Sequence, residues 1–163
     1  LVTGVAAAFC DGVPMLVICG MYQLFGNSFH TVAGQVLPGL GILDVTTHGN
    51  DKRMVGPVCV DTEFGPVVGY ENHSGSTVLG PGQRPFGTVL SGYGNNGEDG
   101  TEGARTLNVI GTYLHGPLLP ANPMVSDALI AVAAVTRWAC RTAGCQIQSR
   151  TMVSNTASTT CAR

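Results

Sequence analysis

The sequence predicts an α/β fold, with a mostly parallel sheet flanked by helices, from three segments. An apolar run at 15–19 is closed at once by Gly20 and a helix-forming stretch, which is the pattern of a buried parallel strand followed by its helix. A second apolar run at 107–113 is bounded in the same way, and residues 126–138 carry a broad apolar face at helical spacing. With 163 residues, the chain is long enough for one domain with a substantial core.

The turn residues divide the rest of the chain into elements. Residues 1–10 are expected to form the end of a helix, which Asp11-Gly12 stops. Between about residue 39 and residue 90, short runs of β-forming residues alternate with Gly, Pro and Asn, which indicates a meander or the edge of a mixed sheet. These runs are 41–47, 55–62, 66–72 and 87–91.

A loop rich in glycine and acids follows at 92–103, and beyond Gly144 the sequence becomes polar and rich in Ser and Thr. We therefore expect one domain over 1–145 and a disordered tail over 146–163. The acids of the loop suggest calcium, but the loop lacks the spacing and the terminal Glu of an EF-hand. It also lacks the Lys of a phosphate-binding loop.

Composition and charge exclude several classes of partner. The 10 acidic and 8 basic residues give a formal net charge of −2, so nothing favours binding to nucleic acid or to an anionic membrane. No apolar run approaches the ~18 residues of a membrane span, and no metal site is expected because the Cys and His residues lack zinc-site spacing. Charged residues make up only 11% of the chain, against roughly 25% in an average domain. We expect another chain or segment to cover part of this surface.

The candidate chemistry lies at Cys19 and His115. Cys19 stands where a strand ends and a helix begins, so a tight turn would lift its side chain out of the sheet, as in a nucleophile elbow. The helix start favours a thiolate, and Gly20 can offer its N–H to a reacting oxygen. His115 follows another predicted strand, and because the carboxyl ends of parallel strands share one edge, it is a candidate base for the thiol. A buried Cys that only packs is the commoner case, and Cys59 has no glycine turn after it.

Four motifs occur in an order that a known family shows. They are Ile18–Gly26 (ICGMYQLFG), Gly69–Gly75 (GYENHSG), the Gly92–Gly103 loop and Gly111–Leu118 (GTYLHGPL). Over about residues 11–135 they resemble the CobB/CobQ-like class I glutamine amidotransferases. The closest likeness is to the glutaminase (GatD-type) subunit of lipid II isoglutaminyl synthase. The resemblance implies the α/β fold of a class I amidotransferase, with the first strands missing from this chain.

The resemblance also implies roles for single residues. Cys19 would attack the side-chain amide of glutamine, and His115 would transfer the protons. The backbone N–H of Gly20 would bind the oxyanion, and Arg53 would hold the α-carboxylate of glutamine. Without the family, Arg53 in its charged segment would be a solvated loop residue.

The resemblance further implies a partner. Ammonia from glutamine would pass to a Mur-ligase-like synthetase that amidates the D-glutamate of lipid II in the cytoplasm. ATP and Mg²⁺ would bind to that synthetase, and no cofactor would bind to this chain. Two alternatives stay open: an amidotransferase of cobyrinate or cobyric acid synthesis, and a non-catalytic regulatory subunit.

The chain departs from the family pattern in three places. Met21 replaces a second glycine, and its Cβ is expected to crowd the elbow. Pro117 stands where triad enzymes carry a Glu, so no third catalytic residue is assigned. The family's domain begins before Leu1, so we expect the chain alone to lack a second oxyanion donor and to be a poor glutaminase. For Glu71-Asn72-His73 we expect a structural or pocket-lining role.

Overall fold

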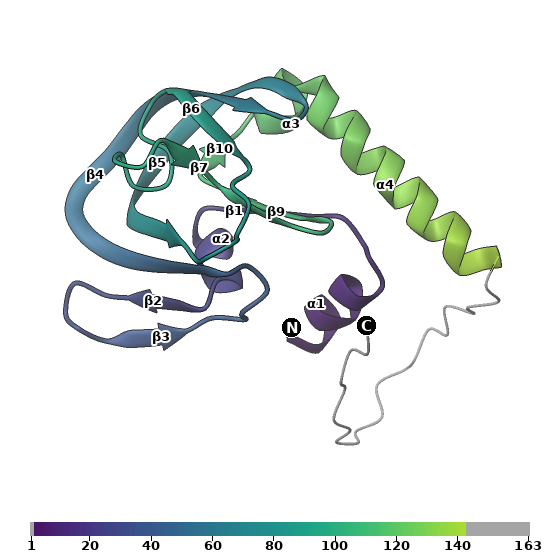
Figure 1. Ribbon diagram of the computed structural model, residues 1–163, viewed down its shortest axis with the longest axis horizontal. Coiled ribbons are helices and arrows are strands. Elements are labelled where there is room, and N and C mark those ends of the chain that lie inside the picture. The colour runs from purple at the N-terminus through teal and green to yellow at the C-terminus, as the bar shows by residue number, and fades with distance from the viewer. Residues whose placement is uncertain (1, 143–163) are drawn as a thin grey trace.

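The computed structural model describes residues 2–142, which form two sheets and four helices (Figure 1). In Figure 1 the long helix α4 runs along the outside of the molecule, and α1 lies near the amino end of β1. The tail predicted at 146–163 lies outside the described residues. The helices are α1 (Val2–Cys10), α2 (Gly20–Phe25), α3 (Leu118–Ala121) and α4 (Pro123–Thr142).

The smaller sheet has three strands in the order β1-β9-β8. They are β1 (Met15–Ile18), β9 (Val109–Thr112) and β8 (Ala104–Thr106). β1 and β9 are parallel, with Ile18 opposite Thr112, and β8 returns antiparallel to β9. The apolar run at 107–113 therefore begins with a turn, where Leu107 has a φ of 52°, and only its later part is strand. Among the described strands, β1 pairs on one side only.

The larger sheet has seven strands and is built on one long hairpin. Its strands are β2 (Ser28–His30), β3 (Val36–Pro38), β4 (Val45–Thr62), β5 (Gly65–Leu79), β6 (Gly87–Ser91), β7 (Thr101–Glu102) and β10 (Leu114–His115). β4 is strongly bent in Figure 1, and the register slips between Gly49 and Met54, where four residues of β4 lie opposite one residue of β5. The charged segment containing Arg53 is this bulge.

The expectation of separate short runs between 39 and 90 is wrong in its boundaries. β4 and β5 continue through glycines that the sequence analysis treated as breaks, because each strand pairs with the other over most of its length. The analysis also missed β2 and β3. The α/β class is confirmed. Parallel pairing in the described chain is limited to β1 with β9 and β2 with β4, and the other ladders are antiparallel.

Two apolar clusters hold the sheets and helices together. One joins α2 to the smaller sheet and to the start of β4, and its largest buried side chains are Tyr22, Phe25 and Tyr113. The other joins the larger sheet to α3 and α4 and contains Leu114 and Val125. β9 contributes Val109 to the first cluster and Ile110 to the second, so the strand is buried on both of its faces.

Candidate active site

Cys19 lies on a sharp turn between β1 and α2. Its backbone has a φ of 55° and a ψ of −113°, a conformation that costs a side-chain-bearing residue on the order of 1–3 kcal/mol. Its N–H donates to the carbonyl of Thr112 at 2.9 Å, and its own carbonyl accepts the N–H of Gln23 at 3.1 Å. The strand and the helix therefore hold the residue from both sides. This geometry is that of a nucleophile elbow.

The first turn of α2 adds backbone donors and an adjoining hollow. Gly20 begins the helix, so its N–H has no acceptor within the helix. An open hollow of about 310 Å³ lies beside it, between α2 and the β2–β3 hairpin, and is lined by Gly20, Gln23, Phe29 and Leu37 among others. That volume is in the range of small-molecule sites. The side chain of Met21 is 42% exposed and points away from the packed side of the turn.

His115 lies just beyond the same edge but belongs to the other sheet. The sequence analysis placed it at the end of a parallel strand; that strand ends at Thr112, and His115 pairs antiparallel with Tyr70 of β5. The backbone of Cys19 bonds to Thr112, which lies three residues before His115 in the chain, so one short stretch of chain connects the two candidate residues. The Nε2 of His115 is buried and has no hydrogen-bond partner in the part of the chain that is described.

Tyr113 lies in the chain between Thr112, which bonds to Cys19, and His115, and it is fully buried. Burial raises the pKa of its phenol, hydrogen bonds with Thr77 and Gln23 oppose the rise, and the charge of Cys19 adds to it. The Tyr113 hydroxyl is 2.6 Å from Thr77 Oγ1 and accepts from Gln23 Nε2 at 3.1 Å. Its ring stacks on His73 at a centroid distance of 3.6 Å. Tyr113 thereby ties α2 to β5.

Arg53 is exposed and lies in the bulge of β4. Its Nε donates to Asn72 Oδ1 at 2.9 Å. Asn72 and Tyr70 are two residues apart on β5 and so share a face, and Tyr70 is the cross-strand neighbour of His115. Arg53 and His115 therefore project from the same face of the larger sheet. Within residues 2–142, no hydrogen bond or ion pair joins Arg53 directly to Cys19 or His115.

The Gly92–Gly103 loop is tied down by two buried side chains. The carboxylate of Glu71 accepts the N–H groups of Tyr93 at 2.7 Å and Gly94 at 2.9 Å. Asn95 accepts the hydroxyl of Tyr22 at 3.1 Å and donates to the carbonyl of Gly103 at 3.0 Å. The loop therefore packs against the helix that follows Cys19. These contacts fit the structural role expected for Glu71 and give the loop a role that the sequence analysis could not derive.

Glu102 is a residue of the site that the sequence analysis missed. It is fully buried, and its carboxyl accepts the N–H of Tyr113 at 2.7 Å and the hydroxyl of Thr112 at 3.0 Å. Burial raises the pKa of Glu102 from 4.5 to about 8. In the sequence it is one of several acids in a glycine-rich loop, and no spacing sets it apart. Only the fold reveals it: Glu102 lies in β7, which pairs with β6 of the larger sheet, and its carboxyl reaches the residues at the end of β9.

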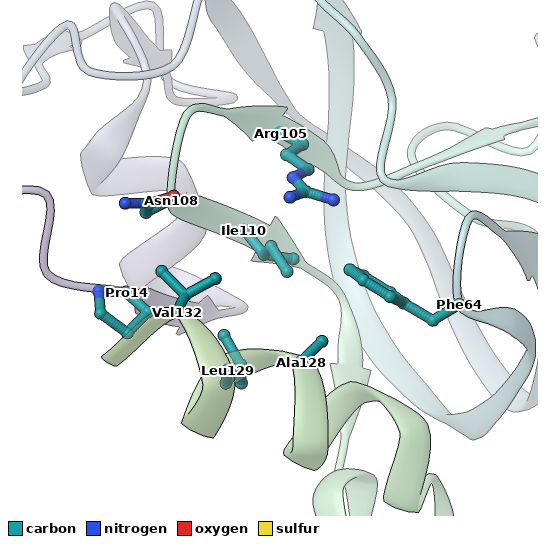
Figure 2. Close-up of a pocket in the computed structure, with 8 residues that line it drawn as sticks. All are labelled: Pro14, Phe64, Arg105, Asn108, Ile110, Ala128, Leu129 and Val132. Atoms are coloured by element: carbon teal, nitrogen blue, oxygen red, sulfur yellow. The ribbon is translucent and has the colours of Figure 1, made fainter. Parts of the chain in front are cut away.

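A second cavity has no connection with these residues. It is an apolar slot of about 50 Å³ between α4 and the smaller sheet, lined by Phe64, Arg105, Ile110 and Leu129 among others (Figure 2). It has room for little more than a water molecule. Among residues 2–142, no three His, Cys, Asp or Glu side chains converge as a metal site would require. No helix in the same part of the chain has the length and apolar character needed to cross a membrane.

Residues 2–123 match the model of the CobB/CobQ-like glutamine amidotransferase domain. The chain belongs to this family. This domain has a fold in common with a solved structure described as a glutamine amidotransferase, which it matches with a TM-score of 0.61 at 15% identity, over 82% of this chain and 68% of that one. The likeness supports the α/β architecture described above.

Two curated relatives of this amidotransferase domain are GatD subunits of glutamine-hydrolysing lipid II isoglutaminyl synthase. The subunit of Staphylococcus aureus is 45% identical over 129 residues, or 78% of this chain and 52% of the relative. That of Streptococcus pneumoniae is 38% identical over 76% of this chain and 48% of the relative. The cobyric acid synthase of Pelotomaculum thermopropionicum is 37% identical over 70% of this chain and 26% of that enzyme. The chain thus spans about half the length of the GatD subunits that it matches.

Proposed function

We propose that this chain carries the glutamine-hydrolysing site of an amidotransferase, with Cys19 as the nucleophile. The observation that carries the proposal is the backbone of Cys19, which is held in a strained elbow at a helix start. A fold maintains such a conformation where a side chain must be presented for reaction. Family membership supports glutamine as the substrate.

In the proposed reaction, the Cys19 thiolate attacks the side-chain carbonyl carbon of glutamine. The N–H of Gly20 donates to the oxyanion that forms. His115, which has taken the thiol proton on its unpaired Nε2, returns it to the departing nitrogen as ammonia leaves. Water, activated by the same imidazole, then cleaves the thioester and releases glutamate. The sum is one glutamine and one water converted to glutamate and ammonia.

The position of Arg53 supports a role in binding the substrate. Its guanidinium is on the same face of the larger sheet as His115, and Asn72 holds its Nε. The two terminal nitrogens of an arginine held in this way suit a carboxylate. We assign Arg53 to the α-carboxylate of glutamine.

We further propose that the ammonia serves a Mur-ligase-like synthetase that binds ATP and Mg²⁺ and amidates the D-glutamate of lipid II in the cytoplasm. The GatD relatives, at 45% and 38% identity, support this acceptor. Amidation of a corrinoid carboxylate is the second candidate, favoured by the cobyric acid synthase at 37% identity. A non-catalytic regulatory subunit is the third, and the elbow argues against it because an inactive site would not need to maintain the strain.

A glutamine analogue that carries a diazoketone tests the site. Mass spectrometry should find a single adduct, on the peptide containing Cys19, and glutamine should protect against it. Equal labelling of Cys59 would contradict the assignment. Incubating the chain with a synthetase, ATP and either lipid II or a corrinoid carboxylate then separates the two acceptors.

A further inference from the structure

The chain passes from the smaller sheet to the larger sheet over only three residues, and these residues adjoin the candidate site. Thr112 ends β9 in the smaller sheet, Leu114 begins β10 in the larger sheet, and Tyr113 alone lies between them. Cys19 is bonded to the first of these residues, and His115 directly follows the last. The conformation of this 112–114 turn therefore sets where the imidazole lies relative to the thiol.

One side chain organises the whole turn. Glu102 Oε1 accepts the N–H of Tyr113 at 2.7 Å, and both of its oxygens lie within 3.1 Å of the Thr112 hydroxyl. That hydroxyl in turn accepts the N–H of Leu114 at 3.0 Å. A single carboxyl thus satisfies the N–H of Tyr113 and the hydroxyl of Thr112 directly, and it holds the N–H of Leu114 through that hydroxyl.

We propose that Glu102 is a positioning residue that sets the geometry between Cys19 and His115. The inference rests on the proposed function, since it assumes that these two residues react together. Glu102 does not touch the substrate; it acts by fixing the 112–114 turn. Its counterpart Glu71 is equally buried and also binds two backbone N–H groups, but those belong to the Gly92–Gly103 loop and not to the turn.

The proposal predicts different results for two substitutions. Glu102→Gln keeps the carbonyl oxygen that accepts the N–H of Tyr113, so kcat should stay within about threefold of the parent. Glu102→Leu fills the space but removes the acceptor. The turn should relax and kcat should fall by about 100-fold, as expected when reacting groups are displaced by about 1 Å, whereas KM for glutamine stays unchanged.

Combination with His115→Ala decides whether Glu102 acts through the imidazole. The variants are made in the longest form of the protein that hydrolyses glutamine, with its synthetase present. If Glu102 only positions His115, Glu102→Leu should cost less than about twofold in the His115→Ala background. Val125→Ala, a buried change in α4 with no hydrogen bond to the turn, is the control; its effect on turnover should be the same in both backgrounds.

The outcomes separate this proposal from the proposed function. If Glu102→Leu lowers turnover equally with and without His115, or if Glu102→Gln is as slow as Glu102→Leu, the positioning role is overturned. If His115→Ala alone leaves turnover intact, the proposed base itself is wrong. Should Glu102→Leu fail to fold, Thr112→Val is used instead. It removes the hydroxyl that links the carboxyl of Glu102 to the N–H of Leu114. It should show the same dependence on His115, with a smaller loss of kcat.

Discussion

The two sheets of this chain each carry one free thiol, and the two thiols differ in their backbones. Cys19 ends the smaller sheet at a φ of 55° and begins a helix. Cys59 lies within β4 of the larger sheet, paired with Val68 on one side and Ser91 on the other. Both are free and half-buried. Exposure therefore does not distinguish the candidate nucleophile from the other thiol. The strained turn at Cys19 and the helix that begins after it do distinguish it.

The same division separates the groups of the candidate site. The smaller sheet provides the nucleophile, and the larger sheet provides His115 and Arg53 on one of its faces. The sheets meet at the 112–114 turn, which Glu102 holds.

The largest expected effect contrasts the two thiols. Cys19→Ala should lower glutamine hydrolysis by more than about 10⁴-fold, because the covalent step is lost. Cys59→Ala should leave kcat/KM nearly unchanged, since a strand thiol has no part in the reaction. Glutamate release measured at saturating glutamine checks both variants. A similar loss in the two would mean that the backbone difference has no functional meaning.

The next effect concerns the open edge of the smaller sheet. The chain spans about half the length of its GatD relatives, and β1 is paired on one side only within residues 2–142. We predict that a form of the protein that spans the full length of these relatives hydrolyses glutamine about 100- to 1,000-fold faster than the 163-residue chain, because a second oxyanion donor is worth roughly 3 kcal/mol. Turnover is compared for both forms, each with and without a synthetase. Equal rates would show that all oxyanion donors lie in the shorter chain.

A glycine in each sheet tests where the packing is tight. A Cβ on Gly111 of β9 would collide with the ring of Tyr22 and approach Leu43 Cδ1 at 2.7 Å, whereas on Gly49 of β4 it would make only ordinary contacts, the nearest at 3.4 Å. Gly111→Ala should therefore lower the free energy of unfolding by about 1–3 kcal/mol. Gly49→Ala should change it by about 0.5 kcal/mol or less. Urea denaturation measures both, and the reverse order would contradict the packing described here.

The carboxyl at the junction of the sheets should make stability depend on pH. Burial raises the pKa of Glu102 to about 8 from 4.5, with a smaller contribution from Glu71. Between these values the folded state keeps a proton that the unfolded state has released, so stability should decrease as pH rises through this window. Glu102→Gln imitates the protonated form. The melting temperature of the parent, relative to this variant, should fall from pH 5 to pH 9; parallel curves would show that Glu102 is ionised in the fold.

The smallest effect tests the larger sheet alone. Arg53→Lys keeps the charge but loses the planar donor pair, so KM for glutamine should rise by about tenfold and kcat should change by less than about twofold. Initial rates over a range of glutamine concentrations separate the two constants. An unchanged KM would show that Arg53 does not bind glutamine and is a solvated charge in the bulge of β4.

Local sequence was enough to predict the elements that carry the nucleophile. The apolar run before Cys19, the glycine after it and the helix formers beyond correctly predicted β1 and α2. The helix over 126–138 was likewise predicted inside α4. These segments are decided by neighbours along the chain, because strand length, turn residues and helical spacing are local properties.

Only the tertiary structure decided how the larger sheet is built and where His115 lies. β4 and β5 continue through glycines that predict the ends of strands, because each strand forms backbone hydrogen bonds with the other along most of its length. His115 was expected on the same sheet as Cys19, but the chain changes sheets at Tyr113, and the bond that holds this turn comes from Glu102. A buried carboxyl in a glycine-rich loop has no local signature; its partners are set by which strands lie side by side. The sequence by itself therefore determined the turn that carries Cys19. The packing of the two sheets determined the positions of His115 and Glu102 relative to that turn.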